Sequence, residues 1–233
     1  AEELQLSRER MVTVQESVRR DIAQQIHGSV QNRLIILLHR LKELERMASS
    51  SEMAAELVDL RQKLGDLIDS HVRPISHRLY PSILRRGLVA ALQSLADQFE
   101  ATLAIDMWLD EGLVRQEKVN PRLILEQVRL AAYRIAEETL TNAAKSANAS
   151  KVSIRLELRS GGWLRLMVRD NGQGFDVKSA SGGSGILMMQ DYAEVAGGEC
   201  VISSVPNDGT EVTATLPLAG PGAECSERSW PSG

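Results

Sequence analysis

From Met11 to Leu44, apolar residues recur at steps of three and four. This spacing predicts one face of a long α-helix. At a rise of about 1.5 Å per residue, the helix would be roughly 50 Å long, and a lone helix of that length needs a partner. Because the steps average near seven residues per two turns, we expect the packing of a coiled coil or a four-helix bundle. The positions concerned are Met11, Val14, Val18, Ile22, Ile26, Val30, Leu34, Leu37, Leu41 and Leu44.

A second helix is predicted after a run of three serines, residues 49–51, which breaks the first pattern and offers an N-cap. The helical spacing then resumes, and Pro74 and Pro81 place the end of the second helix between them. We therefore expect an antiparallel hairpin that dimerises into a four-helix bundle. The resumed positions are Met53, Leu57, Leu60, Leu64, Leu67, His71 and Ile75.

The second half of the chain mixes helical and alternating patterns. Helices are predicted at 86–100, from an N-cap at Asn120 to about residue 147, and at 185–196. Strands are predicted at 102–109, 151–158, 163–168, 199–205 and 211–216. This order favours an α+β sandwich, a sheet covered on one face. We expect three parts: a helical hairpin at 1–80, an α+β domain at 81–218, and a disordered tail rich in Gly, Pro and Ser at 219–233.

Composition and charge exclude several classes of protein. The net charge is −4 and no long run of Lys or Arg occurs, which argues against nucleic-acid binding. The two cysteines, Cys200 and Cys225, have no metal-ligand spacing, and a reducing compartment fits them best. No apolar run is long enough to cross a bilayer, so we expect a cytoplasmic location. The chain begins in a helical pattern without Met, and we expect a fragment of a longer protein whose upstream sensor domain, membrane-anchored or soluble, is absent from it.

His27 is the first candidate for chemistry. It directly follows the apolar position Ile26, so it lies about 100° around the helix, on the flank of the apolar stripe. For a single histidine on a helix, a surface or packing role is the simpler interpretation. A neutral imidazole held at this flank is also a suitable nucleophile toward phosphorus.

Three polar residues of the long predicted helix, Glu138, Asn142 and Lys145, are spaced four and three apart and share one face. A solvated polar face is the simpler interpretation of this pattern. Oxygen ligands from Glu138 and Asn142, with a nearby lysine, also suit Mg²⁺ and a triphosphate, because Mg²⁺ takes few protein ligands and keeps several waters.

Three glycine-containing segments follow. Residues 170–175 (DNGQGF) read most simply as a turn, but Asp170 with two glycines also lets the backbone approach a flat ligand, and the carboxylate can accept from an exocyclic amine. Residues 179–185 read as a linker, or as an anion site and lid at the start of a helix. A hairpin loop accounts adequately for Gly209 and Thr210.

From about residue 19 to residue 218, the chain resembles the sensor histidine kinases of the nitrate-sensor and desaturase-sensor group. RRDIAQQIHGSVQNRL is similar to the phosphoacceptor box of that family. RIAEETLTNAAKSANASKVSI is similar to its N box, VRDNGQGFD to its G1 box, GSGILMMQ to its G2 box, and DGTEVTATLPL to its closing strand. The occurrence of these boxes in the family's order is more specific than any one of them.

The resemblance implies a Bergerat-type ATP-binding fold, the cofactors ATP and Mg²⁺, a homodimer, and a response regulator receiver domain as partner. It implies phosphorylation at His27, metal binding by Asn142 with Glu138 as a neighbouring catalytic residue, and adenine recognition by Asp170. The other nucleotide-binding residues that it implies are Lys145, Gly172, Gly174, Gly183, Gly185 and Thr210.

The sequence departs from the family pattern at three positions. Gly28 stands where an acidic general base normally follows the histidine, Asn32 stands where a glutamine is linked to phosphatase action, and Ser146 replaces a histidine. Loss of a general base typically slows a reaction by about 10²–10⁴-fold, so we expect intact ATP binding and slow autophosphorylation, with Asn32 a candidate phosphatase residue. The alternatives are a phosphatase or scaffold of the same family, a non-signalling ATPase of the same fold, and a structural coiled coil.

Overall fold

The computed structural model describes residues 2–177 and 184–218. The chain divides into two compact units, one formed by Thr13–Ser82 and the other by Ala1–Val12 together with Ile83–Gly233. Gly183 and the predicted tail at 219–233 lie outside the described residues.

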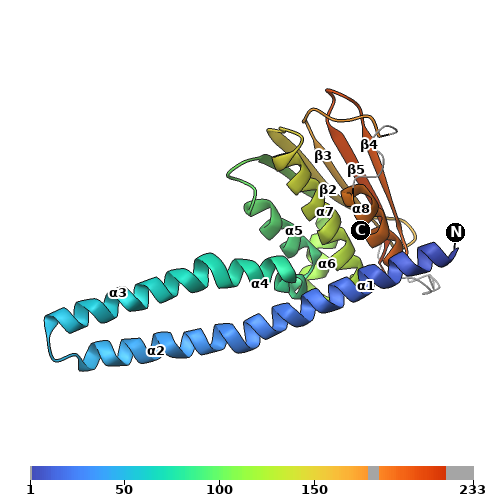
Figure 1. Cartoon of the computed structure of the whole chain (residues 1–233). Helices are drawn as coiled ribbons and strands as arrows, with labels where there is room; N and C mark the ends of the chain where they lie inside the picture. Colours follow the sequence, from blue (N-terminus) through green and yellow to red (C-terminus); the bar gives the residue numbers. More distant parts are fainter. Residues whose placement is uncertain (1, 178–183, 219–233) are drawn as a thin grey trace. The chain divides into compact units, whose positions relative to one another are not determined.

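The first unit is a helical hairpin. Its outgoing arm is the part of α1 (Glu2–Gln25) from Thr13 onward, followed by η1 (Ile26–Gln31) and α2 (Asn32–Met47). Its returning arm is α3 (Ser51–Leu67), η2 (Ile68–Val72) and α4 (Arg73–Leu79). Helices α2 and α3 lie side by side (Figure 1). The hairpin predicted from the apolar spacing is therefore present within one chain.

Specific contacts hold the hairpin together. The Ser50 hydroxyl accepts a hydrogen bond from Met53 N at 3.2 Å, which confirms the predicted N-cap of α3. Arg61 Nε lies 3.1 Å from Glu45 Oε2 and joins the two arms. Near the open end, the Arg20 guanidinium lies over the Tyr80 ring, 5.0 Å from its centroid.

The prediction of one continuous α-helix in the outgoing arm is wrong. Residues Ile26–Gln31 form a π-helical turn that contains His27 and Gly28, and a second π-helical turn, Ile68–Val72, lies next to it in the returning arm. In the second turn, Arg73 N donates to Ile68 O. This wider turn comes directly before Pro74, which has no N–H to donate, and the helix continues past the proline. The returning arm ends at Leu79, between Pro74 and Pro81, as expected.

The second unit contains a five-stranded sheet in the order β1-β2-β3-β5-β4. Strands β1 and β2 are parallel, and the other neighbours are antiparallel. The strands alternate buried and exposed positions, as one covered face requires. Their bounds are Ala104–Leu109, Lys151–Arg159, Trp163–Asp170, Glu199–Ser204 and Thr210–Pro217 for β1 to β5.

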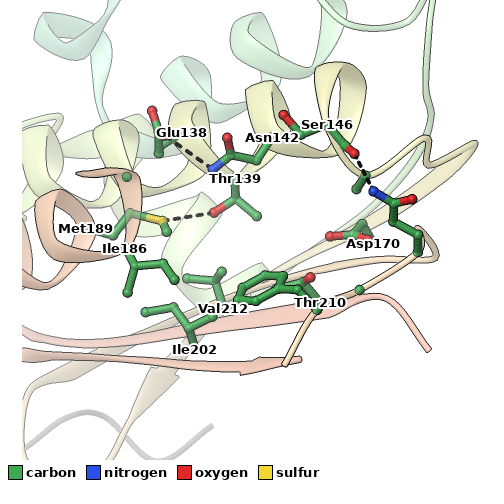
Figure 2. A pocket seen from close by; sticks show the side chains of 15 residues that line it. Glu138, Thr139, Asn142, Ser146, Asp170, Ile186, Met189, Ile202, Thr210 and Val212 are labelled. Carbon is green, nitrogen blue, oxygen red and sulfur yellow. Dashed lines mark hydrogen bonds between the residues drawn. The ribbon is translucent and has the colours of Figure 1, made fainter. Parts of the chain in front are cut away.

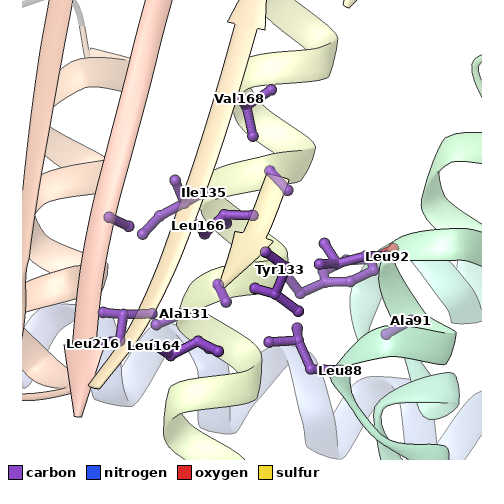
Figure 3. Packing of buried hydrophobic residues seen from close by; sticks show 14 of the residues in the cluster. Leu88, Ala91, Leu92, Ala131, Tyr133, Ile135, Leu164, Leu166, Val168 and Leu216 are labelled. Carbon is purple, nitrogen blue, oxygen red and sulfur yellow. The ribbon is translucent and has the colours of Figure 1, made fainter. Parts of the chain in front are cut away.

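Helices α5 (Leu88–Asp97), α7 (Glu126–Lys145) and α8 (Ser184–Val195) build the core on one side of this sheet (Figures 1 and 3). In Figure 3, Ala131 and Ile135 of α7 face the β3 residues Leu164 and Leu166, and all four are almost fully buried. Burial of this kind stabilises the fold by about 25 cal/mol per Å² of apolar surface. The α+β sandwich with one covered face is therefore present as predicted.

In the second unit, one predicted helix start is wrong and one helix was missed. The side chain of Asn120 accepts from Arg122 N at 3.1 Å and forms a turn instead of a helix cap, so α7 begins later, at Glu126. The helix α6 (Glu111–Val119) was not predicted, although the Asp110 side chain caps it by accepting from Leu113 N at 2.9 Å. Its single fully buried leucine, Leu113, was too weak a periodic signal.

A buried carboxylate, Glu117 of α6, caps the start of α5. It is 3% exposed, and its two oxygens accept from Leu88 N at 2.9 Å and Val89 N at 2.8 Å. A Cβ at Gly87, which has φ +108°, would approach Glu117 Oε2 to 2.8 Å, so this close approach requires glycine. Burial raises the pKa of Glu117, while the two backbone hydrogen bonds and the charge of Arg129 lower it.

Replacement of Glu117 by glutamine is expected to lower the free energy of unfolding by about 1–3 kcal/mol. The amide can accept from one backbone N–H but presents its own donor to the other, which is left buried without an acceptor. Urea unfolding of the whole chain measures the change. The matched control is Glu111→Gln in the same helix, where an exposed carboxylate 3.4 Å from Arg115 contributes little; equal losses in the two variants would contradict the prediction.

Candidate functional site

A cavity of about 440 Å³ lies between α7, α8 and the ends of strands β3, β4 and β5. Figure 2 shows polar side chains from α7 along one side and apolar side chains from α8, β4 and β5 along the other. The cavity is lined by Glu138, Thr139, Asn142, Ser146, Ala147, Asp170, Gln173, Gly174, Phe175, Gly185, Ile186, Met189, Ile202, Thr210 and Val212.

Helix α7 supplies the polar side at positions four residues apart, Glu138, Asn142 and Ser146. Such residues lie one above the other on a helix, and Asn142 Nδ2 donates to Glu138 Oε1 at 3.2 Å. Lys145 is exposed and does not line the cavity. Ser146 lines the cavity in its place.

Asp170 ends β3 inside the cavity and is 4% exposed. Its Oδ1 accepts from Gly172 N at 2.7 Å. Its Oδ2 forms no hydrogen bond within residues 2–177 and 184–218, so it remains able to accept one from a ligand amine. A buried carboxylate with one open acceptor in an apolar wall suits the exocyclic amine of a purine.

The loop after β3 approaches its neighbours at distances that only glycine permits. A Cβ at Gly172 would lie 2.6 Å from Ala147 O, and one at Gly174, with φ +57°, would overlap Val205 O. Residues 170–175 therefore form a closely packed loop and not a simple turn. Instead, the Asn171 side chain accepts from Lys151 N at 2.9 Å and anchors the loop to the start of β2.

The β4–β5 connection closes one end of the cavity. Ser204 Oγ accepts from Phe175 N at 3.0 Å and lies 2.9 Å from Thr210 Oγ1. It also donates to Gly209 O at 2.9 Å. These bonds tie Phe175 to the start of β5. Thr210 lies toward the same end of the cavity as Asp170 (Figure 2).

The opposite end lies where α8 begins. Gly185 lies against Glu138 and Asn142: a Cβ there would be 3.5 Å from Asn142 Nδ2 and would collide with Glu138 Oε1. The first N–H groups of a helix have no partner within it, so this end suits an anion such as phosphate. Gly183, predicted to act at the same end, lies outside the described residues.

The apolar wall was missed by the sequence interpretation. It consists of Phe175, Ile186, Met189, Ile202 and Val212, and Met189 Sδ accepts from Thr139 Oγ1 at 3.5 Å. The strand residues Ile202 and Val212 lie in alternating patterns, and Ile186 and Met189 have helical spacing. Ordinary core residues have the same two patterns, so the sequence does not distinguish the cavity wall from the core. Gln173 was likewise not singled out, and Ser146 was noted only as a departure from the family pattern.

The residue types at the α8 end suit Mg²⁺. Glu138 and Asn142 offer carboxylate and amide oxygens, the ligands that Mg²⁺ prefers, and two protein ligands leave room for the several waters that it keeps. Within the described part of the chain, no group of three or more His, Cys, Asp or Glu residues is arranged to hold a metal.

His27 and Asn32 belong to the helical unit. His27 is exposed in the π-helical turn η1, and a Cβ at the neighbouring Gly28 would have nothing within 4 Å. Asn32 Nδ2 donates to Gly28 O at 2.9 Å, one turn earlier. The imidazole is therefore accessible, as the flank position predicted.

The fold and the cavity together define a class of protein. Residues 127–220 match the family model described as histidine kinase-, DNA gyrase B- and HSP90-like ATPase. This stretch contains α7, the loop after β3, α8 and the β4–β5 connection, which supply all the residues that line the cavity. The second unit therefore contains an ATP-binding domain of this family.

The relatives specify the kind of protein further. The chain is 27% identical over 215 residues to the signal transduction histidine-protein kinase/phosphatase DegS of Brevibacillus brevis, covering 89% of this chain and 53% of that protein. It is 27% identical over 217 residues to the histidine-protein kinase/phosphatase UhpB of Salmonella typhimurium, covering 90% of this chain and 40% of that protein. Both matches therefore extend beyond the ATP-binding domain and include the helical hairpin.

The chain spans about half, or less, of the length of these relatives. Among solved structures, the histidine kinase domain of the blue-light activated kinase EL346 of Erythrobacter litoralis is similar, with 17% identity, a TM-score of 0.49, and coverage of 81% of this chain and 95% of that one. In the described part of the chain, no helix has the length and apolar character needed to cross a membrane.

Proposed function

We propose that this chain is the kinase core of a two-component sensor: it binds ATP with Mg²⁺, transfers the γ-phosphoryl group to His27, and passes it to an aspartate of a response regulator. The observation that carries the proposal is the convergence of Asp170, Asn142 and Gly185 on one cavity, although they are far apart in sequence. The accessible His27 in the same chain supplies a nucleophile.

The chemistry assigned to the residues follows from their surroundings. Asp170 accepts from the adenine amine through its open oxygen, with Thr210 beside it, and the start of α8 at Gly185 receives the phosphates. Mg²⁺, held by Asn142 and Glu138, would neutralise phosphate charge. The imidazole nitrogen of His27 bonds to the γ-phosphorus as the bond to the β-phosphate oxygen breaks, so that ADP leaves and the imidazole loses a proton.

The helical unit is proposed to form a homodimer. Many large apolar side chains of the hairpin are exposed in the single chain, which a monomer in water rarely tolerates over so long a face. A second hairpin would cover them and complete a four-helix bundle. These residues are Val14, Val18, Ile22, Val30, Ile36, Leu37, Leu44, Met47, Met53, Leu60, Leu67 and Ile75.

The cellular setting is part of the same proposal. The reaction needs cytoplasmic ATP and a cytoplasmic response regulator, so we place the chain in the cytoplasm, with its receiver-domain partner. An upstream sensor domain would bias the geometry of the long first helix and thereby the reaction.

A second candidate is a phosphatase or scaffold of the same family. Gly28 favours it, because glycine cannot act as a general base beside His27. The related DegS and UhpB are named as kinase/phosphatases. In this function the side-chain oxygen of Asn32 would orient water toward the phosphoaspartate of the regulator.

Labelling with γ-labelled ATP and Mg²⁺ tests the proposal. The parent chain is expected to acquire acid-labile, base-stable label and the His27→Gln variant none, because this stability pattern is that of a P–N bond, as in phosphohistidine, and only His27 is proposed as acceptor. His39→Gln, an exposed histidine of the same arm, is the matched control and should retain full labelling. Absence of label from the parent, with ATP still bound, would favour the phosphatase or scaffold function; label on the His27 variant would contradict the assignment.

A further inference from the structure

Gln173 joins three segments that surround the cavity. Its backbone N–H donates to Ala147 O at 2.8 Å, and its side-chain Nε2 donates to Ser146 O at 2.9 Å (Figure 2). Its carbonyl accepts from Asn207 N, in the β4–β5 turn, at 2.6 Å. One residue of the loop after β3 is thus bonded to the end of α7 and to the β4–β5 turn.

The end of α7 is directly connected to the polar side of the cavity. The carbonyl of Asn142 accepts from Ser146 N at 2.9 Å and from Ala147 N at 3.0 Å. The carbonyls of the last turn of a helix have no partner within the helix, and Gln173 supplies one for Ser146 and one for Ala147. Through these bonds, a displacement of the loop at Gln173 is transmitted to the turn that begins at Asn142.

The same loop carries Asp170. The Gly172 backbone bonds to the Asp170 carboxylate and packs closely on Ala147, one residue before Gln173. Any residue at position 173 can make the two main-chain bonds, but the bond to Ser146 O needs a side chain that can donate. The side chain of Gln173 is therefore the specific link between the Asp170 loop and the Asn142 helix.

We propose that Gln173 is a positioning residue of the nucleotide site: by bonding to Ser146 O, its side chain sets the separation between Asp170, at the adenine end, and Asn142, at the phosphate end. This inference rests on the proposed nucleotide binding. A ligand that must meet both ends, such as ADP or ATP with Mg²⁺, depends on that separation. Adenosine meets only the Asp170 end and depends on it less.

Calorimetric titration of the whole chain tests the inference with ADP, ATP and adenosine. Gln173→Ala is expected to weaken ADP and ATP binding in Mg²⁺ about threefold to tenfold, the effect of one hydrogen bond, and adenosine binding by less than about twofold. Gln173→Arg keeps N–H donors within reach of Ser146 O and should recover most of the loss. Gln173→Glu places a carboxylate against that carbonyl and should not recover it.

The matched control is Gln127→Ala, because Gln127 is an exposed glutamine of α7 outside the cavity. It should bind all three ligands like the parent. Equal losses for ADP and adenosine, no loss in Gln173→Ala, or no recovery in Gln173→Arg would each overturn the inference while leaving nucleotide binding intact. Failure of the parent to bind ADP would overturn the proposed function, and this inference with it.

Discussion

Replacement of Asp170 by asparagine is expected to weaken ATP and ADP binding about 10- to 100-fold, the effect of losing a hydrogen bond to a charged group. Asparagine has nearly the same shape, so the loop keeps its path. In the parent, one carboxylate oxygen accepts from Gly172 N at 2.7 Å and the other is open to the ligand. An amide has one accepting oxygen, which we expect to stay on the buried Gly172 N, so the adenine amine then meets an NH₂ group.

Recognition of the adenine amine by Asp170 can be measured separately, with a ligand that lacks this amine. Purine riboside triphosphate lacks the exocyclic amine, so the parent should bind it far more weakly than ATP, whereas Asp170→Asn should bind the two ligands almost equally. Asp208→Asn is the matched control, because Asp208 is an exposed carboxylate of the β4–β5 turn, 3.8 Å from Arg169 and outside the cavity. If Asp170→Asn lost ATP affinity but kept full discrimination between the ligands, Asp170 would not read the amine.

Replacement of Gly28 by aspartate is expected to raise the rate of phosphorylation of His27 by about 10²-fold, at the lower limit of what a general base contributes. A carboxylate beside the imidazole can accept its proton as the nitrogen attacks phosphorus. The local structure has room for it, since a Cβ at Gly28 would meet nothing within 4 Å. Glycine is also a weaker helix former than aspartate, so the variant should fold at least as stably as the parent.

Single-turnover labelling with γ-labelled ATP measures this rate. Gly28→Asn and Gly28→Ala are the controls: both add a side chain and remove the glycine, but neither adds a base. Their rates should stay close to that of the parent. If Gly28→Asn were accelerated as much as Gly28→Asp, the gain would come from the helix geometry at η1 and not from proton transfer.

Much of the fold could be predicted because it depends on local patterns. The spacing of three and four predicted both arms of the hairpin, and the serine at position 50 predicted the start of α3. Strict alternation predicted the strands β2 and β3, whose inner faces are buried. These signals lie within a few residues of one another, so no knowledge of distant contacts is needed to read them.

The errors occurred where a distant residue decides a local structure. The start of α7 moved from Asn120 to Glu126, in a region where Leu125 N bonds to Leu218 O and Arg129 bonds to the carbonyl of Pro121. The cap of α5 is Glu117, which lies about thirty residues away from it in sequence. No window on the sequence contains both partners of such bonds.

For the candidate site, the sequence determined the residue types and the order of the motifs, and so predicted Glu138, Asn142, Asp170, Gly174, Gly185 and Thr210, all of which line the cavity. Motif membership did not decide which neighbouring residues line the cavity: Lys145 does not, whereas Ser146 and Gln173 do.

The tertiary structure alone decided the apolar wall and the connection through Gln173. The apolar residues of the wall have the same sequence pattern as the core, and only the packing of α7, α8 and the strand ends leaves space beside them. Covalent order and periodicity specify which face of each element is apolar. The separation between two faces depends on every contact between them, and that is a property of the folded chain as a whole.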